Sequence, residues 1–452
     1  MSLWSLGEVQ AALGGELQGD AAVVPAALSM DTRTIRPGDC FVAIRGQRDG
    51  HAFAAEAVAG GAAALLVDHE LPVRAPQLVV PDTLAARQRW GQARLAACRP
   101  RVVLAITGSV GKTSTKELLA GATGGWKTPG NRNNTLGMPE ALATLPAGLD
   151  AAVLEMGMST PGEIRRLTEI APPDFGLITN IGSVHMEYFP DGQQGIARAK
   201  GELVEALPPG ALWVHLADDP WCRWVALQPW ARARAVPVGP GAAFGWEDET
   251  SLGPRGEQFV LRHPGGRVPV RLRLPGAHHV RNAALAGALA ILAGFDPEAV
   301  AAGLGAAEPL PGRGRLHPLS GGGWLLDESY NAVMESVLAC AATLQTLAGG
   351  PAVAVLGCMR ELGPDSASLH RQTGEGLKAL GIGRVLVYGA DAEALAQGFG
   401  PGATAYPGYE AMRDDPAGLD AVPADARILV KGSLYWGAAR AVARLLERLG
   451  SP

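Results

Sequence analysis

The chain has 452 residues, of which 47% are hydrophobic and 18% charged, and its formal net charge at pH 7 is −5. This composition excludes an intrinsically disordered chain, and the length is sufficient for about three domains. The net negative charge and the lack of a basic block argue against a nucleic-acid partner. No apolar run approaches the ~18 residues of a membrane span, and residues 1–15 do not resemble a signal peptide, so we expect a cytoplasmic protein.

Cysteine and lysine usage adds two constraints. The five cysteines, at positions 40, 98, 222, 340 and 358, show no C-x-x-C pairing, which argues against a structural zinc site or a disulfide framework. Only six of the 39 basic residues are lysines, so arginine carries most of the surface charge. A lysine within a motif is therefore less expected to be generic surface charge, and this applies to Lys112, Lys200 and Lys431.

Residues 1–100 are predicted to form a first α/β unit. The pattern predicts a short amphipathic helix from Leu3 to Leu13 and a turn that leads into a strand over residues 36–43. Asp49-Gly50-His51 predicts a second turn before a helix from Phe53 to Ala59. Taken alone, this unit shows no catalytic pattern.

A phosphate-binding loop is predicted near the start of a second unit, residues 101–311. Gly108-Ser109-Val110-Gly111-Lys112-Thr113-Ser114 lies between an apolar β-branched run, Val102 to Ile106, and a helix-prone segment at 116–120. In this context glycines let the backbone wrap an anion, the lysine supplies a point charge, and the threonine hydroxyl binds Mg²⁺. The usual first glycine is replaced by Ile106, and Gly108 is the extra one.

Polar residues follow two further predicted strands of this unit. Glu155 ends the apolar run from Ala151, where a P-loop fold places a carboxylate for Mg²⁺. His185 comes shortly after the strand Phe175 to Thr179. A lone histidine after a strand is more typical of a cap or a core residue, and it is the shared placement at strand ends that favours a site.

Three other segments of the second unit leave alternatives open. The Asn- and Gly-rich run at 128–135 predicts a loop near the phosphate site. Lys200, in a predicted helix at 196–204, belongs either to a solvated helix face or to the site. Asn282, before a predicted helix from Ala283 to Leu292, is either a helix cap or a contact of a nucleotide base.

Taken together, these motifs resemble the Mur ligases, the ATP-dependent amide-forming enzymes of peptidoglycan synthesis. The resemblance rests on the phosphate loop and on motifs of the middle unit: Gly130-Asn131-x-Asn133-Asn134, Glu155-Met156-Gly157, Thr179-Asn180-Ile181-Gly182-x-x-His185, Lys200-x-Glu202 and Pro275-Gly276-x-His278-x-x-x-Asn282. It extends to Asp31-x-Arg33 and Asp49-Gly50-His51 in the first unit.

The resemblance implies roles for the matching positions. The loop from Gly108 to Ser114, with Lys112 at its centre, would hold the β- and γ-phosphates of ATP. Thr113 and Glu155 would bind one Mg²⁺, and His185 would help to bind a second. Lys200 would carry a CO₂-derived carbamate that positions the second ion. Nucleotide contacts are expected from Asn282, Arg313, Asp327 and Tyr330.

Residues 312–452 are predicted to form a third unit, a small Rossmann-like α/β domain with strands at 324–326, 352–356, 384–388 and 427–430. It lacks a G-x-G-x-x-G, which counts against a dinucleotide-dependent dehydrogenase. The segments 327–332, 356–363 and 430–433 resemble the Mur ligases that join D-alanyl-D-alanine to UDP-N-acetylmuramoyl-tripeptide. The resemblance implies these two substrates, the uridine nucleotide on the first unit and the dipeptide on the third, and we expect a monomer.

Two departures and three alternatives accompany this hypothesis. Val333-Met334 replaces the usual Asn-Pro, and Cys358 replaces the usual Asp, both in the unit expected to hold the dipeptide. The alternatives are a diamino-acid-adding Mur ligase, a folylpolyglutamate synthase, and a P-loop NTPase without ligase activity. The first usually carries an Asn-Pro-Arg signature, which this chain lacks.

Overall fold

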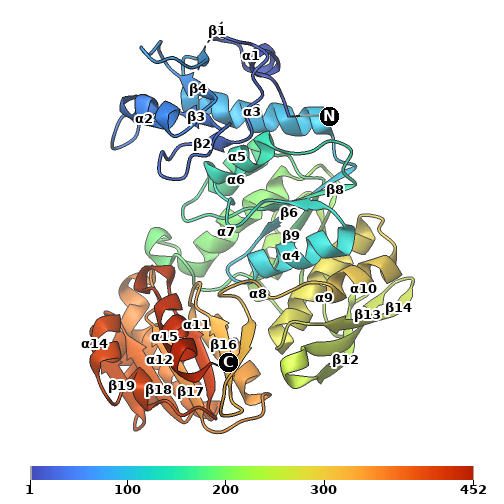
Figure 1. The fold of residues 1–452 in the computed structure, drawn as a ribbon. Coiled ribbons are helices and arrows are strands. Elements are labelled where there is room, and N and C mark those ends of the chain that lie inside the picture. The colour runs from blue at the N-terminus through green and yellow to red at the C-terminus, as the bar shows by residue number, and fades with distance from the viewer. Residues whose placement is uncertain (1–2, 451–452) are drawn as a thin grey trace.

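The computed structural model describes residues 3–450 and contains four β-sheets flanked by helices (Figure 1). The chain passes from the N-terminal part, blue in Figure 1, through a green and yellow middle part to an orange and red C-terminal part. The mixed α/β class with parallel sheets is as the sequence predicts. Within the described residues, no helix has both the length and the apolar character that a membrane span requires.

The N-terminal sheet has five short strands in the order β1-β5-β4-β3-β2, of which only β1 runs antiparallel to its neighbour. The strands and helices of this part are β1 Glu16–Gln18, β2 Leu28–Ser29, β3 Cys40–Val42, β4 Ala64–Val67, β5 Gln77–Val79, α1 Leu6–Leu13, α2 Ala54–Ala59 and α3 Thr83–Cys98. Ser5 caps α1 with a capping box that includes Glu8. Helix α3 packs on α5 of the middle part and so connects the two regions.

The middle sheet is wholly parallel, with strand order β11-β10-β9-β6-β8-β7. Its strands are β6 Val102–Thr107, β7 Trp126–Lys127, β8 Ala151–Glu155, β9 Phe175–Ile178, β10 Leu212–Leu216 and β11 Arg234–Val238, and its flanking helices include α4 Lys112–Thr123, α5 Gly137–Ala143, α6 Glu163–Ile170, α7 Gly192–Ala206 and α8 Pro220–Ala226. All six residues of β6 are buried. This matches its continuous apolar sequence, because parallel strands are covered on both faces.

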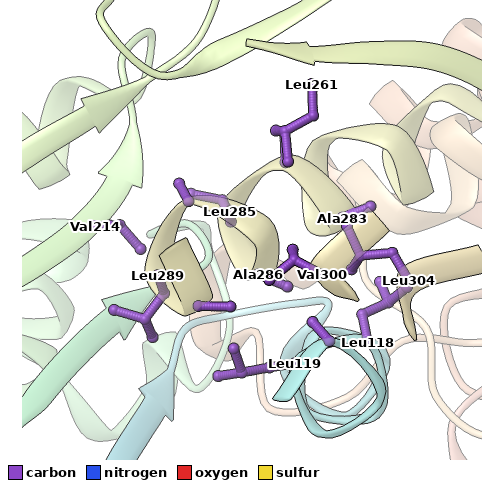
Figure 2. Close-up of a cluster of buried hydrophobic side chains, with 14 of the residues drawn as sticks. Leu118, Leu119, Val214, Leu261, Ala283, Leu285, Ala286, Leu289, Val300 and Leu304 are labelled. Atoms are coloured by element: carbon purple, nitrogen blue, oxygen red, sulfur yellow. The ribbon is translucent and has the colours of Figure 1, made fainter. Parts of the chain in front are cut away.

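A three-stranded antiparallel sheet, absent from the sequence prediction, follows the parallel sheet. It comprises β12 Gly245–Ser251, β13 Glu257–His263 and β14 Gly266–Leu272. The buried helix α9 Ala277–Leu292 packs between this sheet and the parallel one, with α10 Pro297–Gly305 beside it. Figure 2 shows Leu285 and Leu289 of α9 in the cluster that joins them to Leu119 of α4.

The C-terminal sheet has the order β15-β16-β20-β17-β18-β19, and only β15 is antiparallel. Its elements are β15 Arg315–Pro318, β16 Trp324–Glu328, β17 Ala352–Gly357, β18 Arg384–Tyr388, β19 Ala403–Tyr406, β20 Arg427–Lys431, α11 Met334–Gln345, α12 Ser366–Ala379, α13 Ala392–Phe399, α14 Tyr409–Asp414 and α15 Ala439–Leu449. Its parallel strands bring the ends of β16, β17 and β20 to one edge of the sheet.

One local expectation is corrected by the structure. The predicted helix at 283–292 begins earlier, at Ala277, so Asn282 lies within α9 and is not its cap. The sequence does not indicate this start, because no residue with a capping side chain precedes His278 and His279. The five cysteines are all free and buried, in keeping with the absence of pairing in their spacing.

Candidate active site

The phosphate loop connects β6 to α4 in the predicted strand-loop-helix arrangement. Gly108 has φ 151° and Gly111, which precedes the first helical residue, has φ 80°. Neither conformation is readily available to a residue with a side chain. The first turn of α4 consequently directs the free N–H groups of Lys112, Thr113 and Ser114 toward an incoming anion.

The segment after β9 holds the loop in shape. Thr179 Oγ1 donates to Val110 O at 2.6 Å, and Asn180 Oδ1 accepts from Val110 N at 3.1 Å. The Ser109 N–H donates to the Asn180 carbonyl at 2.9 Å, and Ser109 Oγ accepts from Gly182 N at 2.8 Å. The Thr-Asn-Ile-Gly motif is therefore a scaffold for the loop, which explains why it follows the neighbouring strand.

Glu155 lies at the carboxyl end of β8, beside Thr113. Its Oε1 accepts from Thr113 Oγ1 at 3.1 Å and from Asn133 Nδ2 at 2.8 Å. Its buried Oε2 lies 3.4 Å from Lys116 Nζ and accepts no hydrogen bond among the described residues. A carboxylate with a spare oxygen next to a threonine hydroxyl is a donor set that suits Mg²⁺.

Lys112 and Lys200 converge on one carbonyl. The Nζ atoms of both donate to Gly108 O, each at 2.8 Å, and Lys112 also donates to Ser109 O at 3.1 Å. Lys200 is 1% exposed and lies behind the loop. Burial, with the nearby charge of Lys112, holds the pKa of Lys200 well below its ordinary value, which favours a neutral amine.

His185 lies at the boundary between the middle and C-terminal parts. Its Nδ1 is hydrogen-bonded to Oε2 of Glu361, and both residues have left-handed backbone conformations, with φ 59° and 61°. Burial lowers the pKa of His185, although Glu361 opposes the shift. With Nδ1 donating to a carboxylate, Nε2 of a neutral ring is free to bind a metal ion.

The four residues expected to contact the nucleotide differ in their surroundings. The amide of Asn282 lies against Gly111, since a Cβ built there would be 2.9 Å from Asn282 Oδ1. The Arg313 guanidinium lies 3.8 Å from the centre of the Tyr330 ring. Asp327 instead accepts the Gly312 and Ser329 N–H groups at 3.0 and 3.1 Å, so it supports the turn that carries Arg313.

These groups surround one cavity of about 1180 Å³ between the middle and C-terminal parts. From the residues predicted for the site, its lining includes Ser109, Val110, Gly111, Lys112, Thr113, Ser114, Glu155, His185, Asn282, Arg313 and Tyr330. Gly108, Lys200 and Asp327 lie outside this lining. The sequence-predicted residues therefore form a cavity wall with buried supports behind it.

Of the two departures from the family pattern, Val333-Met334 and Cys358, only the first contributes to the C-terminal wall of the cavity. Val333 lines it, whereas Cys358 is buried against Gly389 and its thiol pKa is raised by burial to about 12. Lys431 Nζ donates to Glu328 Oε2 at 3.1 Å, and both residues line the cavity. Lys431 is therefore the cation that the site offers at the end of β20.

A separate polar cluster lies at the carboxyl ends of β3 and β4 in the N-terminal part. Arg45 binds Asp68 through two nitrogen atoms, at 2.6 and 3.1 Å, and contacts Asp49 at 3.0 Å. His51 Nδ1 is bonded to Asp49 at 2.6 Å, and His51 Nε2 accepts the Asp68 N–H at 3.1 Å. The Asp-Gly-His motif is thus held rigidly at a sheet edge where ligands commonly bind.

Sequence reasoning did not predict the contacts of several residues that complete the site, although Asn133 lies in the segment expected near the phosphates. Lys116 is fully buried and donates to Gly130 O at 2.7 Å, which ties the Asn-rich loop to Glu155. Asn133 and Glu361 bind Glu155 and His185 directly. The rarity of lysine could have indicated Lys116, but Glu361 comes from a distant segment and only the folded chain brings it near His185.

Comparison with known proteins identifies the class. The family model of the Mur ligase middle domain matches residues 106–290, and that of the Mur ligase glutamate ligase domain matches residues 312–434. The chain belongs to the Mur ligase family, as the resemblance of its motifs indicates.

Particular relatives are more specific. The chain is 37% identical to the UDP-N-acetylmuramoyl-tripeptide--D-alanyl-D-alanine ligase of Escherichia coli K12 over 409 residues, 88% of each chain. It is 33% identical to the ligase of the same name from Bacillus subtilis 168, over 82% of this chain and 81% of the relative. A crystal structure of MurF from Acinetobacter baumannii superposes with a TM-score of 0.86 at 30% identity and covers 98% of this chain and 99% of its own.

Two more distant structures show how far the structural similarity extends. MurF ligase from Thermotoga maritima, solved in complex with ADP, superposes with a TM-score of 0.79 at 26% identity, over 93% of this chain and 97% of its own. A folylpolyglutamate synthase from Mycobacterium tuberculosis gives a TM-score of 0.63 at 20% identity, over 81% of this chain and 96% of its own. The second comparison shows a shared fold alone.

Proposed function

We propose that this chain is an ATP-dependent ligase that joins D-alanyl-D-alanine to UDP-N-acetylmuramoyl-tripeptide and releases ADP and phosphate in the cytoplasm. The observation that carries the proposal is the cavity, in which a phosphate loop, a carboxylate suited to Mg²⁺ and a wall from the C-terminal sheet face one another. Two relatives with that printed name match the chain over more than four fifths of its length.

The chemistry of the reaction explains this arrangement. A carboxylate is a poor acceptor for an amine, so its oxygen first attacks the γ-phosphate to form an acyl phosphate. The dipeptide amine then attacks the acyl carbon and phosphate leaves. Both steps gather negative charge among crowded oxygens, which Lys112 and the N–H groups at the start of α4 stabilise while the cavity holds both substrates together.

Two Mg²⁺ ions would neutralise the phosphate charge. Thr113 and Glu155 supply oxygen ligands for the first, and Nε2 of His185 supplies a nitrogen ligand for the second. A neutral Lys200 amine can react with CO₂ and release a proton, and the carbamate would place an anion behind the loop.

Each of the three regions would bind a different substrate. Residues 1–100 would hold the uridine nucleotide at the cluster around Arg45 and His51, residues 101–311 would hold ATP, and residues 312–452 would hold the dipeptide. Each role suits a ligand site at the carboxyl ends of parallel strands. A monomer contains all three, so the proposal requires no second copy.

A phosphate-release assay tests the proposal. Phosphate should appear only when ATP, UDP-N-acetylmuramoyl-tripeptide and D-alanyl-D-alanine are all present. Activity with single amino acids but not with the dipeptide would favour a diamino-acid-adding or glutamate-adding ligase. ATP hydrolysis that is indifferent to both other substrates would identify an NTPase without ligase activity and would overturn the proposal.

A further inference from the structure

Glu335 reaches from the C-terminal part across the cavity to Ser183, in the segment after β9 that supports the phosphate loop. It lies in the first turn of α11, and its Oε1 accepts from Ser183 Oγ at 3.1 Å and from Ser183 N at 3.4 Å. A Cβ built on Gly182 would lie 3.1 Å from Glu335 Oε1 and 3.6 Å from the Ser109 Cβ. The carboxylate therefore lies beside the Ser109 end of the loop.

Most other carboxylates of the cavity lining already have a cation or a cluster of N–H donors. Glu155 binds Thr113 and Asn133 and lies near Lys116, and Glu328 pairs with Lys431. Asp219 caps α8, and Glu257 accepts the Gly276 N–H. Glu163 accepts the N–H groups of Ser159 and Thr160. Glu249 accepts from the Trp246 indole on β12, within the antiparallel sheet. Glu335 lines the same cavity, is hydrogen-bonded to Ser183 alone, and forms no ion pair with a lysine, arginine or histidine among the described residues.

An incoming amine needs such a group. An α-amino group has a pKa of about 7.7–8.0, so it arrives at neutral pH largely as an ammonium ion. The cavity lining already contains Lys112 and Arg313, which would repel that cation. A carboxylate beside the loop would attract it to the place where an acyl phosphate forms.

We propose that Glu335 forms the subsite for the ammonium group of the incoming dipeptide, an inference that rests on the proposed ligase function. Ser183 would hold the carboxylate in position through its N–H and hydroxyl groups. Ala332, Val333 and Ala339 line the same wall and suit the methyl side chains of an alanyl dipeptide. Ala339 follows Glu335 by one helical turn and shares its face of α11.

The sequence departure at Val333-Met334 lies beside the proposed ammonium subsite, because Glu335 directly follows Met334. Val333 lines the cavity, and the carboxylate two residues later accepts a hydrogen bond from Ser183 beside the loop. The amine specificity of this chain would then depend on a carboxylate adjoining an apolar residue.

Steady-state kinetics of Glu335→Gln test the inference, with Glu335→Asp as the variant that retains the charge. The KM for D-alanyl-D-alanine should rise at least about tenfold in Glu335→Gln and less in Glu335→Asp, because one charge-assisted hydrogen bond is lost or lengthened. The KM values for ATP and for UDP-N-acetylmuramoyl-tripeptide should stay within about twofold of those of the wild-type protein.

Glu393→Gln is the matched control. Glu393 is the second residue of α13, as Glu335 is of α11, and both side chains are exposed, but Glu393 does not line the cavity. It should leave all three KM values unchanged. The inference fails if Glu335→Gln leaves the dipeptide KM unchanged, or if it raises all three KM values together, as a purely structural contact between the two parts would. A wild-type protein that makes no amide bond would refute the proposed function itself.

Discussion

The close approach of Gly108 to Thr179 makes a quantitative prediction about the phosphate loop. A Cβ at position 108 would lie 1.8 Å from Thr179 Oγ1, and the backbone φ there is 151°. Gly108→Ala should therefore cost about 1–3 kcal/mol in backbone strain and about 1–3 kcal/mol in overpacking. It should also cost about 1 kcal/mol from the lost hydrogen bond between Thr179 and Val110 O.

ATP binding requires this loop conformation, and the free loop of the variant can relax away from it, so the sum of about 3–7 kcal/mol predicts ATP binding at least about 100-fold weaker than in the wild-type protein. Thr179→Ala alone should weaken binding about fivefold, because it removes only the hydrogen bond to Val110. In the Gly108→Ala background the same change should strengthen binding, since the nearest remaining atoms, Thr179 Cβ and N, would lie at 3.0 and 3.1 Å. The sign of the Thr179 effect thus reverses between the two backgrounds.

Isothermal titration calorimetry with ATP and Mg²⁺ on the four proteins measures this cycle. Gly124→Ala, at the other end of α4, is the control: Gly124 has φ 59° and its Cβ would meet nothing within 4 Å. It should lose some stability through strain and keep its ATP affinity. If Thr179→Ala weakens binding by the same factor in both backgrounds, the steric explanation of the loop is wrong.

Three further predictions concern the supports of the site. Glu361→Gln should weaken Mn²⁺ binding in the presence of ATP about tenfold or more, measured by electron paramagnetic resonance, because His185 loses the carboxylate that orients it; an unchanged affinity would refute that role. Removal of CO₂ should lower the ligase rate and bicarbonate should restore it, because burial lowers the Lys200 pKa and a neutral amine is the form that reacts; a rate indifferent to CO₂ would contradict the carbamate. Leu285→Ala, in the core of Figure 2, should lower the free energy of unfolding in urea by about 2–5 kcal/mol, and a loss below 1 kcal/mol would mean that the cluster is loosely packed.

The sequence predicted the parallel sheets and the phosphate loop because both leave strong local patterns. The continuous apolar run of β6 leads directly into a glycine-rich segment and a helix, and Glu155 follows the neighbouring strand β8. The family resemblance of the motifs is confirmed by the comparisons. In these cases the residues that carry the signal are close together in the chain.

The remaining features depended on contacts between distant segments. The antiparallel sheet from β12 to β14 was missed because its strands are half polar, with exposed residues such as Glu249 and Arg267. The bonds of Glu361 to His185 and of Glu335 to Ser183 join residues 176 and 152 positions apart, so no local pattern reports them. The roles of Lys200 and His185 stay predictions that the experiments above address, and the expected nucleotide contact of Asp327 also stays a prediction.

In the proposed reaction, the carboxylate of one substrate is made reactive by transfer of the γ-phosphate at this loop. UDP-N-acetylmuramoyl-tripeptide labelled with ¹⁸O in its terminal carboxylate, incubated with the protein, ATP and D-alanyl-D-alanine, tests it most directly. Mass spectrometry should find one ¹⁸O atom transferred to the released phosphate for each amide bond formed. Phosphate that takes its new oxygen from water alone would contradict the account.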